Sequence, residues 1–267
     1  MQTGVCITVR NKERAVKAEI SGSRQAVLAW KGEYEPGDQI EFKVDRTEDF
    51  YVIRVDDVMD EALVYLTKDM LVYEVPFELK KTAANPKAFT GERHYLTLRR
   101  AEDYEIRAYR NLAKNAADQH ADKGCYPHAW ANVETRGEAV FAARNAIDGV
   151  LANLSHGRWP YESWGINMQD DAQITVEFGR AVDFDTIVLY TRADFPHDNW
   201  WVQVTLTFSD GTSLAWDLDK RTDPHVLKLE KKGIRWVRLE KLIKADDPSP
   251  FPALTQIEIY GTESEKK

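Results

Sequence analysis

The sequence predicts an all-β protein of two β-sandwich domains with jelly-roll-like topology. Short runs rich in Val, Ile, Tyr, Phe and Thr alternate apolar with polar residues and end at Gly, Asp, Asn or Pro. This is the pattern of half-buried strands bounded by turns. At 267 residues the chain is long for one hydrophobic core and comfortable for two, since single cores stop growing near about 250–300 residues.

Composition excludes several classes of protein. Apolar residues make up 43% of the chain and charged residues 30%, which fits a folded protein and excludes a disordered or collagen-like one. The net charge of −8 argues against nucleic acid or an anionic membrane as the main partner, because both favour a basic face. The first residues, Met1–Cys6, lack the basic start and apolar stretch of a secretory signal, so we expect a cytoplasmic protein.

Residues 1–100 are predicted to form the first sandwich, whose role the sequence does not indicate. Its turn at Glu35–Asp38 combines a proline that presets φ with a glycine that allows positive φ. Eight short strands are expected, at a spacing typical of antiparallel sandwiches. They are Val5–Val9, Ala15–Ile20, Ala26–Trp30, Gln39–Val44, Tyr51–Val55, Leu63–Leu66, Leu71–Val75 and Tyr95–Leu98.

Residues 101–262 are predicted to form the second sandwich, followed by a charged tail at 263–267. Glu102–Arg110 fits either a last strand of the first domain or a short connecting helix. Asp210-Gly211 between two alternating runs is a strong hairpin signal. Seven strands are expected: Gln173–Phe178, Thr186–Thr191, Gln203–Ser209, Ser213–Leu218, His225–Leu229, Trp236–Lys241 and Gln256–Tyr260.

Aromatic and titratable residues are concentrated in the second half. It holds seven of the eight Trp and five of the six His, whereas the first half has only Trp30 and His94. Three long loops, at 118–140, 150–165 and 194–201, interrupt its strands, and loops of such length are usually functional. Recognition or chemistry is therefore expected in the second half.

Seven short segments of the second half follow one another in a characteristic order. They are Asn111–Ala113, Ala142–Gly149, Trp164–Gly165, Ile174–Gly179, Ile187–Asp194, Phe208–Gly211 and Gln256–Gly261. This series resembles the discoidin domain, also called the coagulation factor five/eight C-type domain, of the galactose-binding-like superfamily, over roughly residues 111–261. The resemblance implies an eight-stranded jelly roll whose loops at one end bind ligand, and bacterial members are commonly carbohydrate-binding modules.

The resemblance also implies roles for particular positions. A basic residue after the strand matching Ile187–Thr191 binds sugar hydroxyls in such modules, and that position falls on Arg192. Many members hold a structural calcium through an acidic residue after the Asp-Gly and a Glu before the last strand. Here these positions are Val150 and Gln256, which disfavours calcium, an ion that needs several charged oxygen ligands. No cofactor is therefore predicted.

The predicted ligand site combines hydrogen-bonding groups with aromatic rings from three loops. Such groups suit sugars, which expose adjacent hydroxyl pairs and apolar ring faces. Neighbouring strand residues face opposite ways, so at most one of Trp200 and Trp201 is expected to be free. Trp164 is expected in the core. The candidates for ligand contact are Arg192, Asp194, His197, Asn199, Trp200, His156, Arg158, Trp159, Tyr161, His128 and His120.

We expect His120, His128, His156 and His197 to converge at one rim. Convergent histidines permit metal binding or acid–base chemistry. No metal site is predicted, because the sequence contains no HxH, HExxH or CxxC spacing. Cys125 is interpreted as a buried structural thiol rather than a nucleophile.

The favoured function is therefore a non-catalytic carbohydrate-binding protein. One alternative is a carbohydrate-active enzyme or an accessory subunit of one. Another is a protein-interaction module, with a protein partner or a second copy of the chain meeting the aromatic loops. No paired-carboxylate signature fixes a glycosidase mechanism. For the enzyme, the candidate acid–base groups are His120, His128, His197, Tyr126, Asp194 and Glu162.

Overall fold

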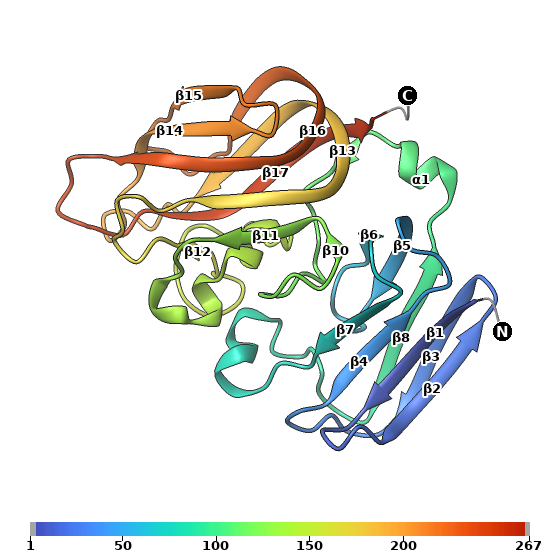
Figure 1. Ribbon diagram of the computed structural model, residues 1–267. Helices are drawn as coiled ribbons and strands as arrows, with labels where there is room; N and C mark the ends of the chain where they lie inside the picture. Colours follow the sequence, from blue (N-terminus) through green and yellow to red (C-terminus); the bar gives the residue numbers. More distant parts are fainter. Residues whose placement is uncertain (1–3, 265–267) are drawn as a thin grey trace.

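The computed structural model describes residues 4–264 and contains two β-sandwiches that lie side by side (Figure 1). The predicted all-β fold class is confirmed, because strands dominate both halves and helices are few and short. Within residues 4–264, no helix has the length and apolarity needed to cross a membrane.

The first sandwich consists of two antiparallel sheets. One has the strand order β2-β1-β4-β7, and the other has the order β10-β6-β5-β8-β3. Ile7, Ile40, Phe42, Ile53 and Leu96 are fully buried between them. All eight predicted strands are present: β1 (Val5–Arg10), β2 (Val16–Gly22), β3 (Gln25–Lys31), β4 (Gln39–Lys43), β5 (Asp49–Arg54), β6 (Ala62–Leu66), β7 (Met70–Glu74) and β8 (Arg93–Arg100). The 3₁₀ helix η1 (Glu78–Ala83) projects between β7 and β8.

The segment after β8 is a short helix, which settles the two alternatives for Glu102–Arg110. Helix α1 (Asp103–Arg107) begins with a capping box, in which the side chains of Glu102 and Glu105 each accept from the other's backbone N–H. The strand β9 (Arg110–Asn111) then pairs with the last strand of the chain. The segment from α1 to β9 therefore leads from the first sandwich directly to the edge of the second.

The second sandwich is built around two long strands that bend from one layer into the other. All seven predicted strands are present, but four of them join in pairs into the bent strands β13 and β16. The second half begins with β10 (Cys125–Tyr126), which belongs to a sheet of the first sandwich. The elements of the second sandwich are β11 (His128–Ala131), η2 (Thr135–Gly137), η3 (Ala139–Phe141), η4 (Ala143–Ile147), β12 (Trp164–Gly165), β13 (Ile174–Thr191), β14 (Trp201–Phe208), β15 (Ser213–Asp217), β16 (His225–Lys244) and β17 (Ala253–Glu263).

The bends create the two layers. The first part of β13 pairs with β11 on one side and with the last part of β16 on the other. The last part of β16 pairs in turn with β14, and β14 pairs with β15. The second part of β13 pairs with the first part of β16 and with β17. Phe178, Leu189, Trp201 and Ile259 are buried between the layers, as is Trp164, as predicted.

The predicted hairpin and the predicted charged tail both lie at strand ends. The hairpin predicted at Asp210-Gly211 joins β14 to β15, with Gly211 at φ +82°. Glu263, assigned to the charged tail, is instead the last residue of β17 and accepts hydrogen bonds from Arg180 and Arg110. Residues 265–267 of the tail lie outside the described residues.

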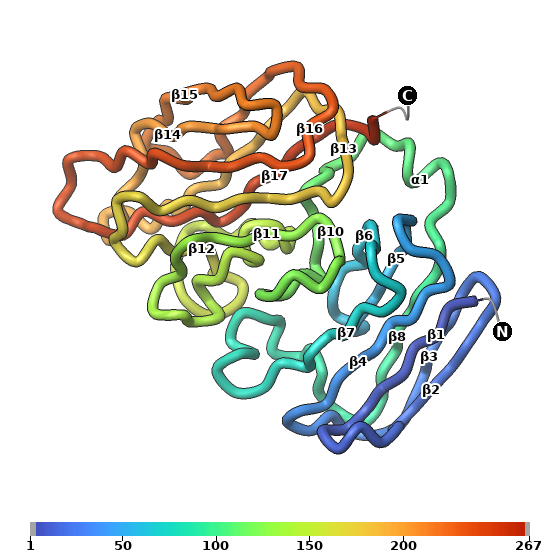
Figure 2. Tube along the Cα trace, viewed as in Figure 1, coloured from blue at the N-terminus to red at the C-terminus, as the bar shows by residue number. Residues whose placement is uncertain are grey.

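The segment between α1 and β11 lies in the junction between the two sandwiches (Figure 2). Strand β10 extends a sheet of the first sandwich, with Cys125 opposite Leu66 and Tyr126 opposite Tyr65. Cys125 and Ala117 pack into the first hydrophobic core although they lie beyond residue 100. The two halves are therefore joined by a shared sheet as well as by a linker.

Candidate functional site

Three loops meet at one end of the second sandwich, and we call this place the loop rim. They are residues 150–163, 192–200 and 245–252, which follow η4, β13 and β16 respectively. The backbone N–H of Ala193 donates to the carbonyl of Asn153 at 2.8 Å. The Asn199 side chain donates to the carbonyls of Ala245 at 3.1 Å and Ser249 at 2.9 Å. These bonds hold the three loops against one another.

A buried ion pair forms the floor of the loop rim. Arg192 donates from Nε and Nη2 to the two carboxylate oxygens of Asp198, which is fully buried. Nη2 also donates to the carbonyl of Phe251 at 3.1 Å. Arg192 is 4% exposed, and its Nε and Nη2 donors bond within the protein. The structure thus places Arg192 and the fully buried Asn199 beneath the rim, whereas the sequence predicted them at its surface.

Four side chains above this floor form the exposed part of the rim. His156 Nδ1 lies 2.8 Å from Asp194 Oδ2, and His197 Nδ1 lies 3.1 Å from Asp198 Oδ1. The imidazoles of His156 and His197 are stacked, with centroids 4.4 Å apart and planes within 7°. The ring of Phe251 is also nearly parallel to that of His197, with planes within 14° and centroids 6.3 Å apart. The rim therefore presents polar ring edges and the carboxylate of Asp194 next to a stack of flat rings.

Residues on the flanks of the rim vary in exposure. Arg158 and Tyr161 are exposed and Trp159 is half-buried, all on the loop that carries His156. The backbone N–H of Trp159 donates to the carbonyl of Thr82 in η1 at 2.9 Å, so this loop also rests on the first sandwich.

The two adjacent tryptophans point in opposite directions, as predicted. Trp201 is 1% exposed and lies in the core. Trp200 is half-buried and packs edge-on against Phe195, with the Lys220 amine 4.5 Å from its ring centroid. The structure therefore gives Trp200 intramolecular partners instead of a free stacking face.

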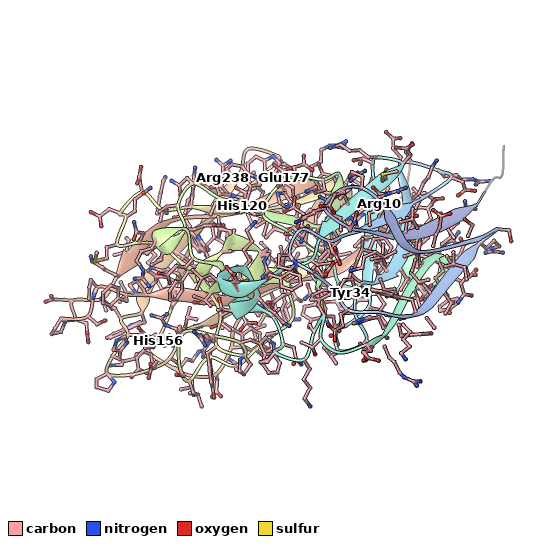
Figure 3. The ribbon with its side chains drawn as sticks, turned by 90° about the horizontal axis from the view of Figure 1, so that it is seen from below. Arg10, Tyr34, His120, His156, Glu177 and Arg238 are labelled. Carbon is pink, nitrogen blue, oxygen red and sulfur yellow. The ribbon has the colours of Figure 1, made fainter. Side chains whose placement is uncertain are left out.

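The expected convergence of four histidines is wrong for His120 and His128. His120 is exposed beside Glu134 and lies well away from His156 (Figure 3). His128 is buried in β11 with Nδ1 2.8 Å from Asp118 Oδ1. Burial alone would lower the pKa of His128, but the hydrogen bond and charge of Asp118 outweigh it and raise the pKa. The loop at 118–140 contributes to the sandwich junction, and its place at the rim is taken by the loop at 245–252.

The acid–base groups considered for an enzyme are also dispersed. Of that set, only His197 and Asp194 lie in the exposed part of the loop rim. Tyr126 belongs to β10 at the junction, where its hydroxyl donates to Asp122. Glu162 is 2% exposed, and within residues 4–264 neither of its carboxylate oxygens has a hydrogen-bond partner. Cys125 is also buried, and burial raises the pKa of its thiol, which agrees with a structural role.

The calcium position implied by the resemblance is bridged by a side-chain amide. Gln256 Nε2 donates to the carbonyl of Asn145 and to Asp148 Oδ1, while its Oε1 accepts from the N–H of Gly149 at 3.1 Å. The amide hydrogens thus occupy the oxygens that a cation would need. With Val150 and Gln256 at the two implied positions, the residues present do not fit a calcium ion.

Two participants in the rim were not among the sequence candidates. Asp198 is the buried partner of Arg192, and Phe251 is 42% exposed and stacks on His197. Phe251 lies in a segment with three prolines in five residues, which indicates a rigid loop but not the direction of its ring. The spacing of Arg192 and Asp198 carries no recognisable signal either, because the contact depends on the turn between them.

Comparison with known proteins gives solved structures only. No protein-family model matches the chain, and no curated protein matches it. Chitosan-binding module 1 of a chitosanase/glucanase from Paenibacillus sp. IK-5 is 19% identical and covers 57% of this chain and 98% of the module, with a TM-score of 0.38. The lectin domain of lectinolysin complexed with Lewis b antigen is 18% identical and covers 57% of this chain and 96% of the domain, with a TM-score of 0.43.

A third similar structure is a fucose-binding module from Streptococcus pneumoniae. It is 13% identical and covers 57% of this chain and 98% of the module, with a TM-score of 0.39. These similar structures are a chitosan-binding module, a lectin domain and a fucose-binding module, and each is less than 20% identical to this chain.

Proposed function

We propose that the loop rim binds a carbohydrate ligand without turning it over. The observation that carries this proposal is the flat stack of His197 on Phe251 next to the His156–Asp194 pair. A pyranose offers an apolar ring face and neighbouring hydroxyls. The stack matches the ring face, and the carboxylate and imidazole can accept and donate hydrogen bonds to the hydroxyls.

The buried floor supports this role because it fixes the rim before ligand arrives. Asp198 is held by Arg192, and Asn199 ties two of the loops together. A ligand then binds without ordering these side chains, which removes part of the entropy cost of binding. An exposed site with few polar contacts favours affinities in the micromolar to millimolar range, or about −8 to −4 kcal/mol.

The test is a glycan array followed by titration calorimetry with the sugars that bind. Phe251→Ala and Asp194→Asn should each weaken binding about 10-fold or more, because they remove the stacking face and an exposed acceptor. His120→Ala is the control, since His120 is an exposed side chain that lies away from the rim. Unchanged binding in both rim variants would refute the proposed site.

Two other outcomes would favour the alternative functions. Release of product from a bound glycan would favour an enzyme that uses His197 and Asp194. A stable protein complex that buries Phe251 would favour an interaction module. We also propose a cytoplasmic location, which fractionation of the native host would test.

A further inference from the structure

The strongest unassigned feature of the structure is a set of four possible metal donors in the loop rim. One donor atom from each of His156, Asp194, His197 and Asp198 can be chosen so that all lie within 4.8 Å of one another. The donors come from two loops that are 38 residues apart at their hydrogen-bonded pair, His156 and Asp194. The positions of these four residues in the sequence do not reveal the site, because the two histidines are not closely spaced along the chain.

The charges in this set favour a cation. Arg192 neutralises Asp198 beneath the rim through two hydrogen bonds. Among the ion pairs of residues 4–264, Asp194 takes part only in the one with His156. With neutral imidazoles, the upper part of the set therefore carries one carboxylate charge that neither Lys nor Arg offsets.

The chemistry of the donors selects the kind of metal. Two imidazole nitrogens with one carboxylate oxygen suit Zn²⁺ and similar transition metals, whereas Ca²⁺ and Mg²⁺ prefer oxygen ligands alone. Metal-bound histidines usually bond a carboxylate through their second ring nitrogen, which fixes the orientation of the ring. The pair of His197 with the anchored Asp198 already has this arrangement.

We propose that His156, Asp194 and His197 bind a divalent transition-metal ion such as Zn²⁺, with Asp198 orienting His197. A metal lies in the plane of each imidazole that binds it, so binding turns at least one ring out of the parallel stack. The side chain of His197 is 53% exposed and that of His156 is 38% exposed, which leaves room for this rotation. The same exposure leaves coordination positions open to water or to a ligand hydroxyl.

The proposed metal site shares His156 and Asp194 with the proposed sugar site, but its test uses no sugar, so the two proposals can fail separately. The full chain is stripped with a chelator and titrated calorimetrically with ZnCl₂, and separately with CaCl₂. We expect one Zn²⁺ site and no Ca²⁺ binding. His156→Ala and His197→Ala should each lower the Zn²⁺ affinity about 100-fold or more. Both side chains are exposed, and circular dichroism will check that the variants remain folded.

Two matched variants make the result specific. His120→Ala removes an exposed histidine outside the rim, and Phe251→Ala removes the stacked ring without removing a donor; both should keep full Zn²⁺ affinity. Loss of sugar binding in Phe251→Ala with Zn²⁺ binding retained would separate the two properties of the rim. Absence of Zn²⁺ binding to the unmodified protein, or unchanged affinity in both rim histidine variants, would overturn the metal site.

Discussion

Asp194 and Asp198 lie four residues apart on one loop but have opposite environments. Asp198 is fully buried and accepts hydrogen bonds from Nε and Nη2 of Arg192, whereas Asp194 lies at the surface beside His156. An arginine stays charged at all accessible pH values. Removing the charge of Asp198 therefore leaves the charge of Arg192 buried without compensation.

We expect Asp198→Asn to lower the free energy of unfolding by about 3–5 kcal/mol, the usual cost of leaving half of a buried ion pair. Asp194→Asn should cost about 1 kcal/mol or less, since exposed pairs contribute little. Urea denaturation of the two variants measures both values. Equal losses would contradict the assignment of Asp198 to the floor and Asp194 to the surface of the rim. Arg192→Ala should resemble Asp198→Asn, which makes it a poor probe of ligand contact.

Glu162 lies buried next to Asp148. Burial, with the charge of Asp148 adding to it, raises the pKa of Glu162 to about 8. The unfolded chain releases this proton near pH 4.5, while the folded protein keeps it up to about pH 8. Over that interval the folded state binds more protons. The free energy of unfolding attributable to this group therefore falls as pH rises.

Glu162→Gln should reduce this dependence, because an amide does not titrate, whereas Asp148, whose pKa burial also raises, still does. Relative to the variant, the unmodified protein should lose about 2 kcal/mol or more between pH 5 and pH 8, at about 1.4 kcal/mol for each unit of pKa shift. Urea midpoints at the two pH values measure the difference. Glu13→Gln, at an exposed position, should follow the unmodified protein. Parallel pH profiles for all three proteins would show that Glu162 is not the responsible group.

At the scale of elements, the bends of β13 and β16 depend on two glycines with the same backbone conformation. Gly179 and Gly233 both have φ +68°, a region that side chains with a Cβ adopt at a cost. They differ in what surrounds them. A Cβ on Gly179 would lie 2.4 Å from the ring of Tyr126, whereas a Cβ on Gly233 would have nothing within 4 Å.

Gly179→Ala should therefore be the more damaging substitution. Both variants carry the conformational cost of about 1 kcal/mol, and Gly179→Ala adds a steric cost of about 1–3 kcal/mol. Thermal and urea unfolding of the pair isolate the steric part, because the conformational part is common to both. Equal destabilisation would mean that Tyr126 moves away freely and that β10 is not packed tightly on the bend of β13.

Strand positions could be predicted from the sequence to a much greater extent than the loops. Alternating patterns such as Gln39–Val44 and Gln203–Ser209 report which face of a strand is buried, and that local property survives in the fold. The bends of β13 and β16 were predicted as gaps between separate strands. The alternation of apolar and polar residues is interrupted there because the chain changes layers. In a single sequence, such an interruption has the same pattern as a loop.

The candidate site was predictable only in part, for a related reason. The segments that contain His156 and Asp194 were identified correctly as loops, and their side chains do meet. His128 was assigned to the same place, but it bonds Asp118 in the sandwich junction. Which end of a sandwich a loop reaches depends on the packing of the whole domain, and no short-range pattern records it.

At the scale of the whole molecule, the two sandwiches share structural elements on several levels. Strand β10 of the second half completes a sheet of the first, and Cys125 packs in the first core. The guanidinium of Arg180 lies 4.9 Å from the ring centroid of Phe50, across the junction. Ala83 of η1 packs with Val140 and Phe141 in a separate small cluster. Opening the junction therefore exposes apolar surface that belongs to both halves.

We expect the two sandwiches to unfold in one cooperative transition, because loss of either half exposes core residues of the other. The distribution of tryptophan allows a direct test, since seven of the eight lie in the second half. Tryptophan fluorescence reports mainly on that half, whereas far-ultraviolet circular dichroism reports on both, so their urea midpoints should coincide. Arg180→Ala should move both midpoints together by weakening the junction. Two separated transitions in the unmodified protein would instead show that the sandwiches unfold as independent domains. The loop around Trp159 would then keep its shape without its hydrogen bond to Thr82 in η1.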